Sequence, residues 1–87
     1  MEYLPIFLRL EDRLAVIIGG GAVAARKLDL LRRAGARIRV VAPILGDEIA
    51  TLAAQGAIEH RARGFAATDL DGAELAIAAT DDHQTNQ

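Results

Sequence analysis

The stretch Leu14-Ala15-Val16-Ile17-Ile18-Gly19-Gly20-Gly21-Ala22-Val23-Ala24 decides the fold of this chain. Its apolar, largely β-branched first half predicts a buried strand, which runs directly into three glycines. A helix-forming segment follows at once, so the stretch carries a GxGxxA pattern. This pattern is typical of a turn whose backbone approaches a pyrophosphate group at the N-terminus of a helix. The stretch therefore predicts a dinucleotide site.

A tight turn without any ligand is the alternative, because glycines also permit positive φ angles for purely structural reasons. The context favours the ligand. A predicted strand precedes the glycines, a predicted helix follows them, and the small Ala24 stands where helix and strand must pack closely. We interpret Gly19, Gly20 and Gly21, with Ala22 and Val23 at the start of the helix, as cofactor-binding residues.

Strands and helices alternate along the rest of the sequence. We expect helices at residues 23–34 and 47–55, strands at residues 37–41, 58–61 and 75–79, and an irregular segment or short helical turn from Phe65 to Leu70. Such alternation indicates parallel βαβ units with right-handed crossovers. The prediction is an α/β, Rossmann-like doubly wound parallel sheet, partial, with about four core strands plus a short N-terminal strand at residues 6–10.

Counted from the Leu14 strand, the expected strand order is 3-2-1-4, and ligands bind where the order reverses, between the first and fourth strands. The fourth strand is apolar on both sides, which is typical of a central parallel strand. Thr80-Asp81-Asp82 is expected to cap a further helix.

Length and composition limit the function. The 87 residues fit one small domain, and we expect an NAD(P)-binding Rossmann-like domain over 1–87 that is truncated at its C-terminal end. A net charge of -2 gives no field that would gather nucleic acid, and the absence of cysteine excludes disulfides and thiolate metal sites. Without a signal sequence or a long apolar run, the chain is expected to be cytoplasmic, with no membrane partner.

The second strand ends in Val41-Ala42-Pro43, without the acid that the generic fingerprint uses to bind the adenosine ribose. No arginine directly after Pro43 offers a clamp for a 2′-phosphate, so we expect NAD rather than NADP. Asp81 and Asp82 could form an acid–base pair, but helix capping explains them better.

Charged and titratable residues elsewhere predict no metal site. His60 and His83 lack the spacing of a two-histidine site, and neither is expected to be a ligand. Arg26 and Lys27 could reach a phosphate or an anionic substrate, although a solvated helix face is the simpler interpretation. Charges at residues 61 and 63 are likewise expected to be solvated loop charges.

Several segments resemble the N-terminal part of the siroheme synthase family, more narrowly its precorrin-2 dehydrogenase/sirohydrochlorin ferrochelatase module. They include Leu4-Pro5-Ile6-Phe7, the glycine turn, Val40-Val41-Ala42-Pro43 and Ala78-Ala79-Thr80-Asp81-Asp82. The resemblance covers nearly the whole chain, and its opening and ending are its most specific parts. It implies NAD-dependent oxidation of precorrin-2, a tetrapyrrole, to sirohydrochlorin in siroheme (porphyrin) biosynthesis, followed in bifunctional members by insertion of iron.

The resemblance also implies roles for residues. The glycine turn with Ala22 and Val23 would hold the pyrophosphate, Pro43 and Ile44 would border the adenosine, and Thr80 would lie beside the nicotinamide. The family's catalytic aspartate follows a later strand, so no residue of this chain is assigned a catalytic role. The region that makes the family's homodimer is expected beyond residue 87 as well.

Two other interpretations stay open. A non-catalytic regulatory domain that senses NAD would keep the glycine turn and need no later aspartate. A chain that folds poorly and binds nothing would leave the Leu75 strand as an unpaired edge.

Overall fold

Four parallel strands and two helices make up the fold in the computed structural model, which describes residues 10–79. The elements are, in chain order, β1 (Leu14–Ile18), α1 (Ala22–Arg33), β2 (Arg37–Val41), α2 (Asp47–Ala54), β3 (Glu59–Arg61), the short 3-10 helix η1 (Ala67–Leu70) and β4 (Ala73–Ala78). The strand order is β3-β2-β1-β4, and every pairing is parallel. The predicted Rossmann-like α/β fold and its strand order are therefore confirmed.

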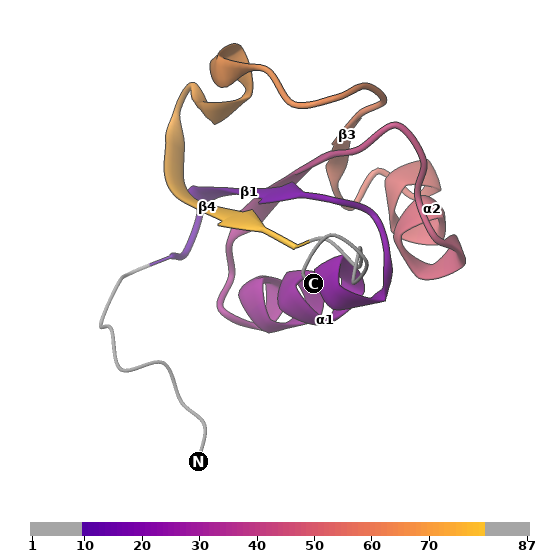
Figure 1. Cartoon of the computed structure of the whole chain (residues 1–87). Coiled ribbons are helices and arrows are strands. Elements are labelled where there is room, and N and C mark those ends of the chain that lie inside the picture. Colours follow the sequence, from indigo (N-terminus) through magenta and orange to yellow (C-terminus); the bar gives the residue numbers. More distant parts are fainter. Residues whose placement is uncertain (1–9, 80–87) are drawn as a thin grey trace, which may run out of the picture.

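The two faces of the sheet are covered differently. Helices α1 and α2 lie on one side, whereas the connection from β3 through η1 to β4 passes over the other side (Figure 1). Alternate residues of β1 explain this division, because successive side chains of a strand point to opposite faces. Ala15 and Ile17 pack with the buried face of α1 in one cluster, and Leu14 and Val16 belong to a second cluster.

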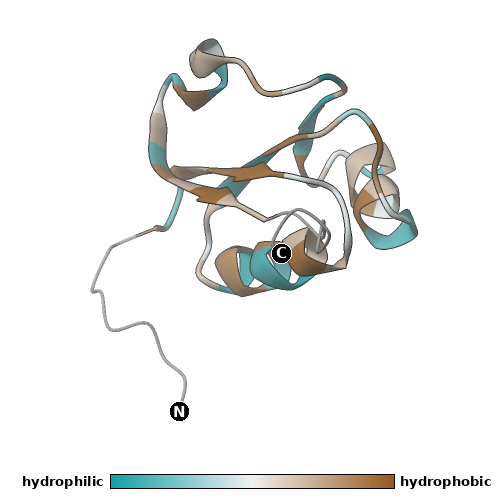
Figure 2. Ribbon diagram, in the orientation of Figure 1, coloured by the Kyte–Doolittle hydropathy of each residue, from teal (hydrophilic) through white to brown (hydrophobic). Residues whose placement is uncertain are grey.

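The main core lies between α1 and the sheet. Ala24, Leu28 and Leu31 are buried on one face of the helix, at the spacing that an amphipathic helix requires. In the hydropathy colouring β1 is brown, β3 is teal, and α1 carries both brown and teal residues (Figure 2). Gly35 follows the helix with a φ of 85°, as expected for a residue that ends a helix.

Strand β4 is the edge strand of the described sheet and pairs only with β1, as the predicted order requires. Its apolar sequence, typical of a central parallel strand, is therefore open on one side within the described residues. Its residues accordingly alternate between half-buried and exposed, with Leu75 and Ile77 facing the main core and Ala76 and Ala78 facing outward. Apolar residues on both sides of a strand thus did not distinguish a covered face from an open one.

Element boundaries differ from the predicted ones by one or two residues, as helix and strand ends commonly do. Strand β4 begins at Ala73 rather than Leu75, and η1 is the short helical turn expected within residues 65–70. The predicted strand at residues 6–10 and the helix predicted after Thr80 lie outside the described residues, except for the buried Leu10. Neither helix within residues 10–79 is long and apolar enough to cross a membrane.

Candidate functional site

The glycine turn joins the carboxyl end of β1 to the N-terminus of α1. Gly19 has a φ of 128°, which residues with a Cβ atom rarely adopt, and its N–H group donates a 2.9 Å hydrogen bond to the carbonyl of Val41. Gly21 is the N-cap of α1, and its carbonyl accepts the N–H of Ala25 at 3.0 Å. The strand, turn and helix that the motif requires are therefore all present.

Gly20 is glycine because another loop packs against it. A Cβ atom built at this position would collide with the carbonyl oxygen of Ile44 and lie 3.2 Å from both the Cβ of Ala42 and the Cα of Leu45. The Gly20 carbonyl also accepts a 2.8 Å hydrogen bond from the N–H of Gly46. The loop between β2 and α2 is thereby held against the glycine turn.

This contact brings the two predicted parts of the cofactor site together. A pocket of about 320 Å³ opens at the carboxyl ends of β1 and β2, and its lining combines both loops: Ile18, Gly19, Gly20, Val41, Ala42, Pro43, Ile44 and Phe65. None of these side chains is charged. Pro43 and Ile44 are exposed at the rim of this pocket, so a bound ligand could contact both side chains.

Two other pockets are less suited to a dinucleotide. The largest, about 840 Å³, lies between α1 and α2 and includes none of the three glycines. A pocket of about 220 Å³ touches Gly20 and Gly21 but is also lined by Asp47 and Glu48, whose carboxylates would repel a pyrophosphate. We therefore assign the uncharged pocket to the candidate cofactor site despite its moderate size.

A buried carboxylate holds the loop that carries Phe65. Asp69 has no exposed surface, and its oxygens accept hydrogen bonds from Arg63 at 2.8 Å and 2.6 Å, from Arg61 at 3.1 Å and from the N–H of Ala66 at 2.8 Å. Hydrogen bonds from Arg63 hold the pKa of the Asp69 carboxyl below its ordinary value, against the opposing effect of desolvation. The carboxylate therefore stays ionised at neutral pH.

Arg61 and Arg63 keep 33% and 43% of their side-chain surface exposed, but they are not only the solvated loop charges that were expected. Both guanidinium groups bind Asp69, and Arg61 also binds Glu59 at 2.9 Å. A buried carboxylate requires cationic partners, and these two arginines supply them. In the sequence, Arg61-Ala62-Arg63 is followed by Asp69, six residues after Arg63. An analysis of helical and strand periodicity does not detect this spacing, so the ion pairs were not predicted.

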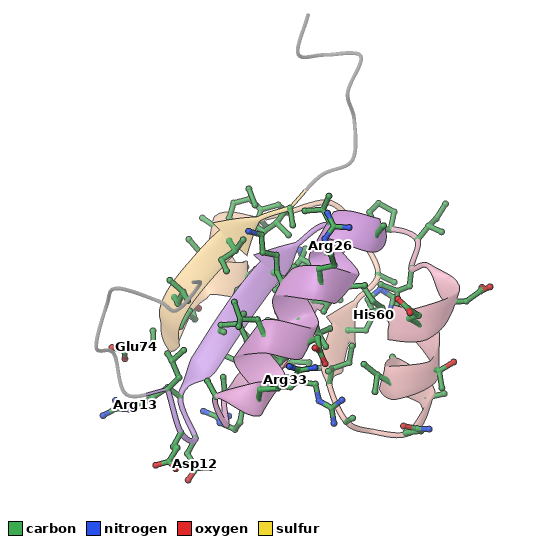
Figure 3. The ribbon with its side chains drawn as sticks, turned by 90° about the horizontal axis from the view of Figure 1, so that it is seen from below. Asp12, Arg13, Arg26, Arg33, His60 and Glu74 are labelled. Carbon is green, nitrogen blue, oxygen red and sulfur yellow. The ribbon has the colours of Figure 1, made fainter. Side chains whose placement is uncertain are left out.

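The remaining candidate residues have simpler surroundings. Arg26 and Lys27 are exposed on α1, and Figure 3 shows Arg26 toward the turn end of the helix and Arg33 toward the other end. The Nε2 atom of His60 lies 2.9 Å from the carbonyl oxygen of Ala42. Because a carbonyl can only accept, this contact is a hydrogen bond in the tautomer that carries the proton on Nε2. Thr80, His83 and the two aspartates after Thr80 lie outside the described residues, although Ala79 pairs with Ile18 at the same sheet edge.

Comparisons with known proteins identify the family and the fold. Residues 6–87 match the model of a family described as "Putative NAD(P)-binding". The siroheme synthase of Thioalkalivibrio sulfidiphilus is 52% identical over 87 residues, and that of Methylobacillus flagellatus is 49% identical over 87 residues. A solved structure of SirC, precorrin-2 dehydrogenase, superposes with a TM-score of 0.81 and 30% identity, covering 97% of this chain and 42% of that one. The predicted resemblance to siroheme synthases is confirmed.

The chain spans a small part of these relatives. The matched regions cover 100% of this chain but only 18% of the first siroheme synthase and 19% of the second.

Proposed function

The chain belongs to the NAD(P)-binding family, and from this we infer that its glycine turn and the adjoining uncharged pocket hold NAD as the cofactor-binding part of a precorrin-2 dehydrogenase. The single observation that carries the proposal is the convergence of the glycine turn and the Pro43–Ile44 rim on one pocket. Pyrophosphate would lie at Gly19, Gly20 and Gly21 with Ala22 and Val23, adenosine at Pro43 and Ile44, and the nicotinamide half toward Thr80.

The residues present fit this cofactor. The positive φ of Gly19 lets the chain turn sharply at the end of β1, so that the backbone rather than a side chain meets the ligand. The N-terminus of α1 favours a negatively charged group there. No cationic side chain lines the pocket to receive a 2′-phosphate, which supports NAD over NADP.

The reaction is proposed from the relatives. One of them is named as a precorrin-2 dehydrogenase, and the others as siroheme synthases. The cofactor held by these residues would supply the acceptor for a hydride from precorrin-2, with one proton released as sirohydrochlorin forms. This chain would orient the cofactor, while the acid or base that handles the proton, the tetrapyrrole pocket and the homodimer contacts would come from the further length that the relatives possess.

Cofactor binding is tested by thermal unfolding of the chain with and without NAD. A ligand that binds only the folded state raises the midpoint, and NAD at about a hundred times its Kd should raise it by roughly 10 to 20 °C in a domain of this size. Gly21→Asp is the matched control. Gly21 is an N-cap with a φ of -95° and extended ψ, so aspartate should fold well there while its carboxylate repels the pyrophosphate. An equal NAD response in both proteins would contradict the proposal.

The reaction is tested by a chimera. Replacing the matching region of the Thioalkalivibrio sulfidiphilus siroheme synthase with this chain should preserve NAD-dependent oxidation of precorrin-2. The same chimera carrying Gly21→Asp should lose that step. A chimera that binds NAD but does not oxidise precorrin-2 would refute the proposed reaction and leave cofactor binding intact.

A further inference from the structure

Phe65 is the only Phe, Tyr or Trp within residues 10–79, and its ring is not placed in the core. It is 46% exposed and lines the candidate cofactor pocket together with the glycine turn and the β2–α2 loop. It comes from a third segment, the connection between β3 and η1. A large apolar side chain half open to solvent at the rim of an uncharged pocket has surface that a ligand can cover.

Asp69 fixes the chain on both sides of this ring. Its carboxylate binds the Arg63 side chain two residues before Phe65 and the N–H of Ala66 directly after it. The Asp69 N–H donates back to the Ala66 carbonyl at 2.8 Å, and Arg63 also donates to the Gly64 carbonyl at 3.1 Å. A surface loop without these bonds would be free to carry its aromatic residue away from the pocket.

We propose that the Phe65 ring is the surface on which the adenine of the cofactor packs, and that Asp69 is the positioning residue that holds the ring there. The inference rests on the proposed function and adds two residues to the site. In the Rossmann arrangement the adenosine half lies on the side of the second strand, and Val41, Ala42 and Pro43 at the end of that strand line the same pocket as Phe65.

Adenine suits this pocket better than the other parts of the cofactor or the substrate. All eight lining residues are uncharged, so no side chain there would attract the carboxylates of a tetrapyrrole, and the phosphates are left to the main chain of the glycine turn at one end of the pocket. An aromatic side chain binds a flat, neutral base through its face regardless of hydrogen-bond pattern. Since no acid follows β2 to bind the ribose, contact with the base would supply much of the affinity at this end.

The test measures NAD and ADP-ribose binding to the chain by calorimetry, together with NOEs from the adenine protons to the protein. Loss of one base–aromatic contact weakens binding roughly 5- to 100-fold, and Phe65→Ala should weaken NAD and ADP-ribose by the same factor because both carry adenine. Phe65→Tyr should retain binding. Leu70→Ala is the matched control, since Leu70 is 40% exposed in the same connection but does not line the pocket.

The wild-type NOE does not depend on any variant. The chain has two phenylalanines, so a contact from adenine to the Phe65 ring is assigned by its loss in Phe65→Tyr or Phe65→Ala. An NAD complex without that NOE, or with equal affinity in Phe65→Ala, would overturn the inference and leave the proposed function standing. Failure of the wild-type chain to bind NAD would instead remove both.

The positioning role is separated from general stability by a double-mutant cycle. Asp69→Asn should weaken NAD binding in the wild-type background at a temperature where both proteins are folded. If Asp69 acts through the ring, the same substitution should have no further effect in the Phe65→Ala background. Additive losses in the double variant would show that Asp69 does not position Phe65.

Discussion

Gly20→Ala should destabilise the chain although the backbone conformation at this position accepts alanine. Gly20 is not among the glycines with positive φ, so the obstacle is steric rather than conformational. The new methyl group would collide with the Ile44 carbonyl and crowd Ala42 and Leu45, each at 3.2 Å. Two of these three contacts are with backbone, which cannot be relieved by a rotamer change.

The magnitude follows from three contributions. Overpacking costs about 1–3 kcal/mol, and weakening of the hydrogen bond from the Gly46 N–H to the Gly20 carbonyl costs about 1 kcal/mol more. Alanine also lowers the conformational entropy of the unfolded chain, and this offsets about 0.4–1 kcal/mol of the lost stability. The net loss of about 2 kcal/mol corresponds to a fall of roughly 8 to 16 °C in the unfolding midpoint of a domain this small.

The assay is thermal and urea unfolding followed by circular dichroism. Gly64→Ala is the matched control, because Gly64 has no positive φ and a Cβ built there meets nothing within 4 Å. It should leave stability unchanged or raise it slightly. Equal midpoints for Gly20→Ala and Gly64→Ala would refute the conclusion that the two loops are in close contact at Gly20.

Three further predictions concern charge, cofactor choice and packing. The pKa of Asp69 is lowered in the folded chain, so its stabilising contribution is complete above the unfolded pKa, about 3.9, and is lost as pH falls through the folded value. Acid titration of the unfolding free energy should therefore be less steep in Asp69→Asn than in the wild type; identical slopes would contradict this. Ile44→Arg, at a side chain that is 81% exposed, should fold normally and shift the ratio of Kd values toward NADP by about tenfold, measured by calorimetry. Ala24→Leu, at a fully buried position between α1 and the sheet, should cost about 1–3 kcal/mol in urea unfolding, whereas the exposed Ala54→Leu should change stability by less than about 0.5 kcal/mol.

Most of the fold was predictable because local signals agreed with one another. The apolar run at β1, the glycine turn and the helical spacing of α1 each favour the same βαβ unit, and the β2 boundaries match the predicted ones. The environment of β4 was not predictable. Its apolar residues are compatible with a strand covered on one face or on two, and only the tertiary arrangement distinguishes these cases.

The candidate site was predictable where it follows from a motif or from the family resemblance. Gly19, Gly20 and Gly21 form a motif in the sequence, and Pro43 and Ile44 follow from the resemblance. Phe65 and Asp69 belong to a connection without helical or strand periodicity, so neither signal points to them. The partners of Asp69 lie six and eight residues away and are fixed by the path of the β3–η1 loop. A sequence reading that treats arginines as solvated by default cannot find a buried carboxylate that binds them.

The absence of an acid at position 42, directly after β2, follows from the same packing that requires glycine at position 20. Ala42 is only 4% exposed, and its Cβ lies against the place where a Gly20 side chain would be. A carboxylate at position 42 would be desolvated there, and the uncharged pocket offers no cationic partner for it. The tight contact between the two loops therefore excludes a ribose-binding acid at position 42. If NAD binds as proposed, recognition of its adenosine falls to main-chain groups near Pro43 and to the apolar surface of Ile44 and Phe65.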